Sequence, residues 1–271
     1  MLPHFVSFIA GLFFLGSCLL LERLTRGFLP NPLVNDRPRP LRGDTLSGAS
    51  ALACMAFIPP GSLPPLCNSA WGAVFWGMLF TFSSLVAPER PQASAPARGF
   101  RSAHTVPAAL AALTLALLSY YAWRCGLPGS PLNLGLFVAM PLWGRLDILG
   151  KAGFFLVFLG LFLACPAGDT LSSQGLFPAK PLRRLAYFSL LAVIFYPRPL
   201  ALLSDLSGWE ALAADYVCFW VSVLALIRGG AFLDGIVKKK RYPIMMWGLG
   251  AVLLLTSLHN SVGILPPGAV F

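Results

Sequence analysis

The residues that could do chemistry in this chain are the ionisable ones inside its apolar segments. Asp215 stands about one turn inside a long apolar segment, and Ser222 follows on nearly the same helical face. Charged groups are costly in lipid and commonly face a cavity, a partner or a conducting path. The pair predicts a polar stripe lining a cavity or, alternatively, an acid that stabilises a helix start. Arg228 falls on a largely different face, where its side chain is expected to reach the membrane surface.

A second group of charges closes the stretch from 133 to 151. Arg145, Asp147 and Lys151 lie close together there. Because an acid four residues before a base suits an ion pair along a helix, we expect Asp147 and Lys151 to neutralise each other near the membrane surface. The alternative is that these charges line the path itself. The apolar part before them supplies about 18 Å of helix, against roughly 30 Å for a bilayer core, and Pro141 interrupts it.

A third candidate is the basic loop at 22–46, which holds five arginines and four prolines. Arg37, Arg39 and Arg42 are candidates for contact with phosphate or a lipid headgroup. Proline fixes φ and removes a backbone donor, so we expect this loop to be extended rather than helical.

About fifteen residues around this loop resemble a loop of the UbiA-type membrane prenyltransferases. The residues that carry the resemblance are Asn35-Asp36, the run from Arg37 to Gly43, and Leu46-Ser47-Gly48. The resemblance implies an enzyme that acts on an isoprenoid. In that family two spaced aspartates follow the Asn-Asp pair and hold Mg²⁺ and a diphosphate, and this sequence lacks them. A solvated basic loop is therefore the expectation, with the prenyltransferase-like enzyme as the alternative.

Composition places these groups in a membrane. Of 271 residues, 57% are hydrophobic and 11% charged, whereas a soluble domain has roughly 25% charged residues. No stretch between the apolar segments is long enough to bury a core of its own, so we expect one all-α transmembrane domain over residues 1–271. The net charge of +10 comes from Lys and Arg between apolar segments. That pattern is typical of cytoplasmic loops and argues against a nucleic-acid partner.

Metal and haem sites are not expected. The six cysteines form no Cys-x-x-Cys pair, and the three histidines lie outside the apolar segments. The sequence identifies no cofactor.

The apolar segments predict helices that must position the charges. They lie at 5–21, 47–58, 69–87, 105–123, 152–166, 185–203, 209–234 and 243–258. The second and third are joined by a Pro- and Gly-rich turn, which predicts an αα-hairpin. In the fourth, Ala108, Ala112 and Ala116 recur every four residues, and this small-residue face is expected to pack against another helix.

Loop charge predicts the topology. The basic clusters lie at 22–46, 88–104, 167–184 and 238–241. All of them fall on the cytoplasmic side if the stretch 133–151 dips into the membrane and returns, or forms one broken span with the next segment. If both of its halves crossed, the last two clusters would lie outside. We therefore predict about eight transmembrane helices, with Arg124 and both termini on the opposite side, in a bacterial inner membrane or an organellar membrane.

Two classes of function follow from these features. The first is a multi-pass membrane protein that provides a path for a solute, an ion or a proton, because broken spans and scarce buried charges mark such sites. In this class we expect one subunit of a larger redox or ion-translocating complex, with the lipid bilayer and other membrane subunits as partners. The second is a membrane-embedded enzyme that modifies a lipid or isoprenoid through the loop at 22–46. Neither the substrate nor enzymatic activity is decided by the sequence.

The subunit reading has one further basis. The first apolar segment ends in Glu22-Arg23, and an acidic stretch runs from Asp205 to Asp215. These features resemble the quinone-site membrane subunit of complex I and related hydrogenases. The resemblance implies a role in redox-linked ion movement, and the acidic motif of that family is missing here.

Overall fold

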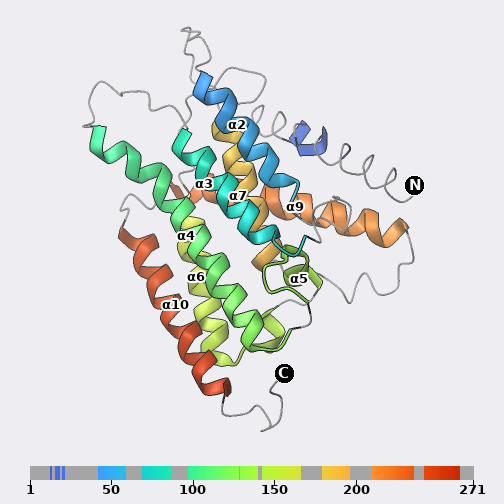
Figure 1. Cartoon of the computed structure of the whole chain (residues 1–271), viewed down its shortest axis with the longest axis vertical. Helices are drawn as coiled ribbons and strands as arrows, with labels where there is room; N and C mark the ends of the chain where they lie inside the picture. The colour runs from blue at the N-terminus through green and yellow to red at the C-terminus, as the bar shows by residue number, and fades with distance from the viewer. Residues whose placement is uncertain are drawn as a thin grey trace.

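A computed structural model describes residues 13, 16–18, 20–21, 42–58, 69–86, 97–127, 129–139, 142–165, 179–195, 209–234 and 241–262. Every regular element in these residues is a helix (Figure 1). The helices are α2 (Arg42–Met55), α3 (Gly72–Val86), α4 (Ala97–Arg124), α5 (Leu134–Ala139), α6 (Ile148–Ala164), α7 (Ala179–Phe195), α9 (Trp209–Asp234) and α10 (Arg241–Val262), with a short 3-10 helix, η1 (Leu142–Arg145). The predicted all-α class is confirmed for the described residues.

Three of the described helices are long and apolar enough to cross a membrane. The spans are Thr105–Arg124 in α4, Ala213–Gly230 in α9 and Tyr242–His259 in α10. The apolar parts of α2, α3 and α6 are shorter. The count of about eight crossings therefore stays a prediction.

The first two described long helices form the predicted hairpin. The Ser47 hydroxyl donates to the backbone oxygen of Ser83 at 2.6 Å, and the Cys54 thiol donates to that of Trp76 at 3.7 Å. Because contacts early in α2 pair with contacts late in α3, the two helices are antiparallel. The hairpin follows from two apolar segments joined by helix-breaking residues.

A glycine seam joins α6 to α10. A Cβ atom built on Gly153 would lie 2.7 Å from the backbone oxygen of Gly250, and one built on Gly250 would lie 2.6 Å from the backbone nitrogen of Val157. Gly160 lies equally close to the backbone of Trp247. The two antiparallel helices therefore touch backbone to backbone, which only residues without side chains allow.

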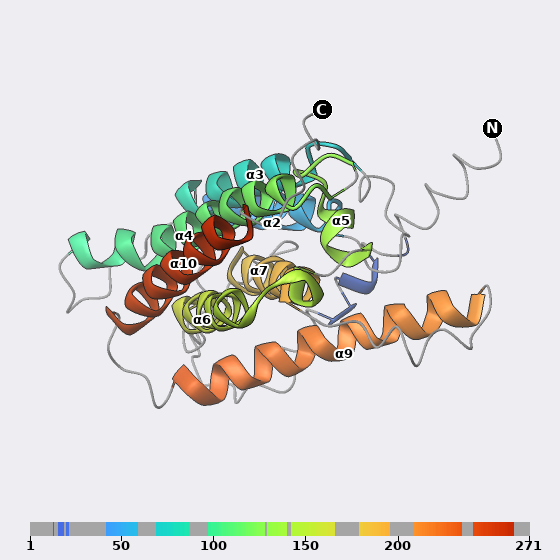
Figure 2. The same ribbon diagram turned by 90° about the horizontal axis from the view of Figure 1, so that it is seen from below.

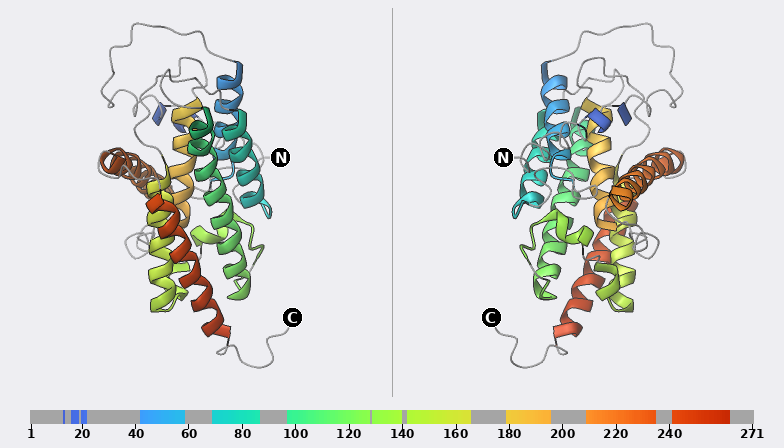
Figure 3. Two further views of the ribbon diagram at one scale, coloured as in Figure 1. Left: turned by 90° about the vertical axis from the view of Figure 1, so that its left-hand side faces the viewer. Right: turned by 90° about the vertical axis from the view of Figure 1, so that its right-hand side faces the viewer.

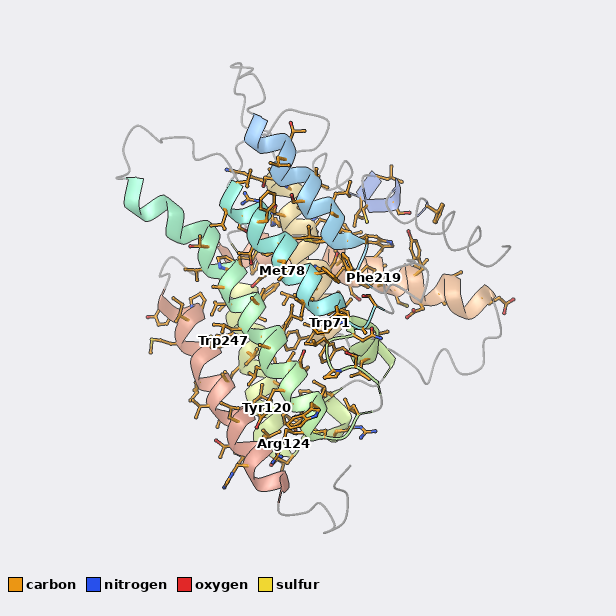
Figure 4. All side chains as sticks on the ribbon, in the orientation of Figure 1. Trp71, Met78, Tyr120, Arg124, Phe219 and Trp247 are labelled. Carbon is orange, nitrogen blue, oxygen red and sulfur yellow. The ribbon has the colours of Figure 1, made fainter. Side chains whose placement is uncertain are left out.

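Helix α4 runs parallel to α10. The indole Nε1 of Trp247 donates to the Thr114 hydroxyl at 2.7 Å, and Tyr121 contacts Ser257 one level further along both helices. Figure 4 shows Trp247 between the two ribbons. These polar contacts fix the register of α4 and α10.

Helix α7 forms the centre of the molecule. Nearly all of its side chains are buried, and it contacts α2, α3, α5, α6 and α9. The Tyr187 hydroxyl donates to the backbone oxygen of Leu161 at 2.7 Å, and the ring centroids of Phe195 and Phe154 are 4.5 Å apart, so α7 is antiparallel to α6. It therefore points the same way as α4 and α10.

Helix α9 lies across the other helices. Figures 2 and 3 show it lying along one side of the molecule and crossing the other long helices rather than running alongside them. Its residues Gly229 and Gly230 face the rings of Phe162 and Phe188. α9 thus has the composition of a span but not the direction of the other two.

The connection from the end of α4 to the start of α6, which contains the stretch 133–151, starts and ends at the same end of the bundle. α5 is a single short helix that packs against α7, and η1 leads from there to Asp147. Asp147 contacts Ser257, which also contacts Tyr121 near the end of α4. The predicted break near Pro141 falls between α5 and η1.

Candidate functional site

Asp147 caps α6 and also binds α10. Its backbone is extended, and its Oδ1 accepts a hydrogen bond from the backbone N–H of Gly150 at 2.6 Å. The same oxygen accepts a hydrogen bond from the Ser257 hydroxyl at 2.5 Å. An aspartate that accepts from the first turn is a favoured helix cap. Because Ser257 is buried on α10, this cap also fixes the start of α6 to its neighbour.

Two residues of α4 complete what we call the Asp147 cluster: Asp147, Ser257, Tyr121 and Cys125. The Tyr121 hydroxyl interacts with both the Ser257 hydroxyl and the Cys125 thiol. Burial raises the pKa of the Cys125 thiol, an effect larger than the opposite ones of its hydrogen bond with Tyr121 and of the Arg145 charge. The cluster thus joins α4, α6 and α10 at one end of the bundle.

The predicted ion pair between Asp147 and Lys151 is wrong. Both side chains belong to the described part of the chain, and the Lys151 ammonium lies 5.9 Å from the centroid of the Trp143 ring instead. Asp147 has two neutral donors that lie closer and are rigidly held, so the capped geometry wins over the helical pairing. Arg145 is exposed on η1.

Aromatic side chains surround this end of the bundle. Tyr120, Trp123 and Trp143 are all at least 44% exposed. Figure 4 shows Tyr120 and Arg124 together near the last turn of α4. Exposed Tyr and Trp beside a basic residue are typical of a membrane–water boundary.

Asp215 lies on the buried face of α9 with only 8% of its surface exposed. Phe219, labelled in Figure 4, and Val223 continue that face and belong to the hydrophobic core. On the opposite face Val217 and Val221 are more than half exposed. α9 therefore turns an acid inward and apolar side chains outward, the reverse of a soluble amphipathic helix.

The sequence also predicted Ser222 and Arg228 of α9 as candidate site residues. The half-buried Ser222 hydroxyl donates to the backbone oxygen of Cys218 at 2.8 Å, within its own helix. Arg228 is exposed, on a different face from Asp215. The predicted stripe is therefore centred on Asp215 alone in the described residues.

Basic residues expected in a loop lie instead in the first turns of α7. Arg183 is 8% exposed, and a guanidinium nitrogen of Arg184 donates to the backbone oxygen of Ile227 on α9 at 3.1 Å. The Arg184 guanidinium also lies 5.9 Å from the centroid of the Phe188 ring. Sequence reasoning missed them because Lys and Arg between apolar segments usually mark loops.

The structure describes only residues 42–46 of the predicted loop at 22–46. Arg37 and Arg39 lie outside the described residues. Arg42 begins α2, so the expectation of an extended loop to residue 46 is wrong at its end. Within α2 no proline follows, and the helix starts as soon as the proline run has ended.

Comparison with known proteins leaves the site unassigned. No match was found. No protein-family model fits the sequence, and neither a curated protein nor a solved structure resembles it closely enough to count as a relative.

Proposed function

We propose that this chain is a polytopic membrane protein that provides a path for an ion or a proton, and that it acts as one membrane subunit of a larger ion-translocating or redox complex. The observation that carries the proposal is the buried charge of two contacting helices. Asp215 on α9 and Arg183 on α7 are both 8% exposed. Ionisable groups in a membrane interior are costly and mark conducting paths or binding sites.

Uncharged polar groups in the interior support the same reading. Ser189 on α7 and the indole of Trp76 on α3 are fully buried, and neither the hydroxyl nor the indole nitrogen has a hydrogen-bond partner among the described residues. Buried polar atoms are rarely left unsatisfied in a purely structural core. Together with Asp215 they give the core polar positions that a conducting protein needs.

The geometry also supports the proposed topology. The helices α2, α4, α7 and α10 run in one direction, and α3 and α6 run in the other. The connection from α4 to α6 starts and ends near Ser257, as a segment with a re-entrant part would. We assign the basic end of the bundle to the cytoplasm and Arg124 to the opposite side, following the positive-inside bias.

Purification followed by flux measurement tests the proposal. The chain is extracted in mild detergent at native expression level, with any companions it retains, and is reconstituted into liposomes that hold a pH-sensitive dye. We expect fixed companions and proton or cation flux that Asp215→Asn abolishes. Glu210→Gln, an exposed acid on the same helix, is the matched control and should leave flux unchanged. A lone chain without flux would contradict the proposal.

One observation favours the second candidate, an enzyme that modifies a lipid or isoprenoid. α2, which begins at Arg42, packs along α7, so the end of the loop at 22–46 lies beside the basic first turns of α7. A diphosphate held there would be bound by Arg37, Arg39 and Arg42. Their joint replacement by Gln should then abolish isoprenoid turnover while membrane insertion survives. Loss of orientation alone would favour the solvated loop.

A further inference from the structure

One side of α9 carries exposed residues in an order that is the same from both ends. They are Glu210, Ala213, Val217, Val221, Ala225 and Arg228, and we call them the outer face of α9. The steps between them are 3, 4, 4, 4 and 3 residues, which is 18 residues in five turns, so the face runs straight along the helix. From either end the order is charge, alanine, valine, valine, alanine, charge, and the two charges are opposite in sign.

Neither water nor lipid suits the outer face of α9 along its whole length. Val217 and Val221 in its middle are 58% and 59% exposed, and apolar surface is disfavoured in water. Glu210 and Arg228 at its ends are also exposed, and charged side chains are disfavoured in lipid. A protein surface with apolar side chains between two charges satisfies both parts of the face.

A second copy of the chain offers such a surface when its α9 runs in the opposite direction. The midpoint of the face is position 219. Two antiparallel α9 helices centred there bring valine opposite valine, alanine opposite alanine, and Glu210 opposite Arg228 at both ends. The alanines let the two backbones approach closely, and each charge meets the opposite charge.

The direction of α9 in the molecule makes this pairing possible within one membrane. Two copies inserted in the same orientation are related by a two-fold axis along the membrane normal. That axis keeps the spans of α4 and α10 parallel to their counterparts and reverses a helix that lies across them. Figure 2 shows α9 at one edge of the molecule, lying across the other long helices, which are all on the same side of it. Its counterpart in a second copy therefore runs antiparallel to it.

We propose that the outer face of α9 binds the same face of a second copy of the chain, as an antiparallel pair about a two-fold axis. Arg228 also interacts within its own chain. Because a guanidinium has five N–H donors, it can keep that contact and donate to Glu210 of the second copy as well. Asp215 lies on the opposite, buried face of α9. The proposed ion path is thus contained in one chain, so separating the copies should leave flux unchanged and the two proposals fail separately.

Disulfide cross-linking between two single-cysteine variants tests the direction of the pair. In a cysteine-free background, chains with Ala213→Cys and chains with Ala225→Cys carry different tags and are reconstituted together, with any companions they retain. In the antiparallel pair these two positions are opposite each other, close enough for a disulfide. Two chains of the same variant hold their cysteines about 18 Å apart along the helices, too far for one. We expect disulfides between the two variants and not within either.

The other outcomes of the cross-linking overturn the proposal. Disulfides within a single variant would show that the two helices are parallel. If both variants unfold at the temperature of the cysteine-free protein and form no disulfide, lipid or a different subunit covers the outer face of α9.

Charge reversal measures the same contact without cysteines. Arg228→Glu places an acid opposite Glu210 at both ends of the pair, and it should raise the dissociation constant of the dimer on the order of tenfold or more. Fluorescence energy transfer between labelled chains at increasing lipid-to-protein ratios measures this constant. Adding Glu210→Arg to Arg228→Glu makes the charges opposite again and should restore the wild-type value.

The matched control is Arg145→Glu, the same change of charge at an exposed residue of η1, and it should leave the dissociation constant unchanged. If Arg228→Glu does not fold, Glu210→Arg alone takes its place, with the same expected loss. Equal weakening by Arg145→Glu, or no recovery in the double reversal, would overturn the proposal.

Discussion

The α6–α10 seam and the α7–α9 crossing hold two helices together in opposite ways. At the seam, a Cβ on Gly153 or Gly250 would meet backbone atoms at 2.6–2.7 Å. At the crossing, a Cβ on Gly230 would meet the tip of the Phe188 ring at 3.0 Å. Backbone atoms cannot move without moving a helix, whereas a ring can rotate. The seam is therefore a rigid joint and the crossing an adaptable one.

The polar groups of the α6–α10 pair also differ from those of the α7–α9 pair. Asp147 at the end of the seam is satisfied by Gly150 and Ser257, both within short hydrogen-bond distance. Asp215 and Arg183 are ionisable residues buried on α9 and α7, the two helices that meet at the crossing. We infer that the α6–α10 seam is scaffold and that the α7–α9 pair carries the function, since function needs both an ionisable group in the interior and room for small movements.

The largest expected effect is a stability loss at the seam. Gly153→Ala should destabilise the protein by about 1–3 kcal/mol, because the added methyl group must push two backbones apart. Gly230→Ala at the crossing should cost less than about 1 kcal/mol, since the Phe188 ring can shift. Thermal unfolding in detergent measures both. Gly248→Ala is the control, because a Cβ atom at Gly248 would meet open space. If Gly248→Ala lowers the unfolding temperature as much as Gly153→Ala does, the close backbone contact at the seam is not the cause of the loss.

A double-mutant cycle sharpens the account of Asp147. Asp147→Ala should cost about 0.5–2 kcal/mol through loss of the cap. Its combination with Ser257→Ala should show a coupling of about 0.5 kcal/mol or more, because the two side chains share a hydrogen bond. Denaturation of the four proteins in one detergent gives the coupling. Strict additivity would contradict a stabilising hydrogen bond between Asp147 of the α6 cap and Ser257 of α10.

The same cycle with Lys151 has the opposite expectation. Since Lys151 faces Trp143 rather than Asp147, the variants Asp147→Ala and Lys151→Gln should add within about 0.5 kcal/mol. A larger coupling, with the double variant more stable than the sum of the single losses, would restore the ion pair that the sequence predicted.

The smallest effect concerns the reactivity of Cys125. The thiolate is the form that reacts with maleimide, and burial raises the pKa of this thiol above its ordinary value of roughly 8.5. Labelling of a variant with Cys125 as its single cysteine should be slow at neutral pH and should increase as the pH rises past that value. Tyr121→Phe removes a contact that lowers the pKa and should slow labelling further. Faster labelling of Tyr121→Phe at every pH would contradict the packed cluster.

Long apolar segments made much of the fold predictable. The helix expected at 209–234 is α9 as observed, and the span expected at 105–123 coincides with Thr105–Arg124. The hairpin of α2 and α3 followed from its turn. In each case the signal is local, because continuous hydrophobicity requires helix in a membrane whatever surrounds it.

Features that depend on partners were not predictable. Ala116, expected to face protein with Ala108, is exposed, because burial on α4 follows the positions of α3, α6 and α10 and not the small residues alone. Nothing in the sequence around Ser257 or Tyr121 marks either residue as part of the site. Their role comes from contacts with Asp147 and with each other, which lie far apart along the chain. The direction of α9 across the bundle depends on the rings of α6 and α7 that it packs against.

The most direct test compares the two acids in one flux assay. Asp147→Asn and Asp215→Asn each remove one charge, and asparagine keeps the shape and, at Asp147, the capping ability of the side chain. In proteoliposomes prepared from the same purified assembly, the account predicts normal flux for Asp147→Asn and no flux above protein-free liposomes for Asp215→Asn, with similar unfolding temperatures. Lost flux at Asp147 beside normal flux at Asp215 would contradict it and would place the path along the stretch 133–151.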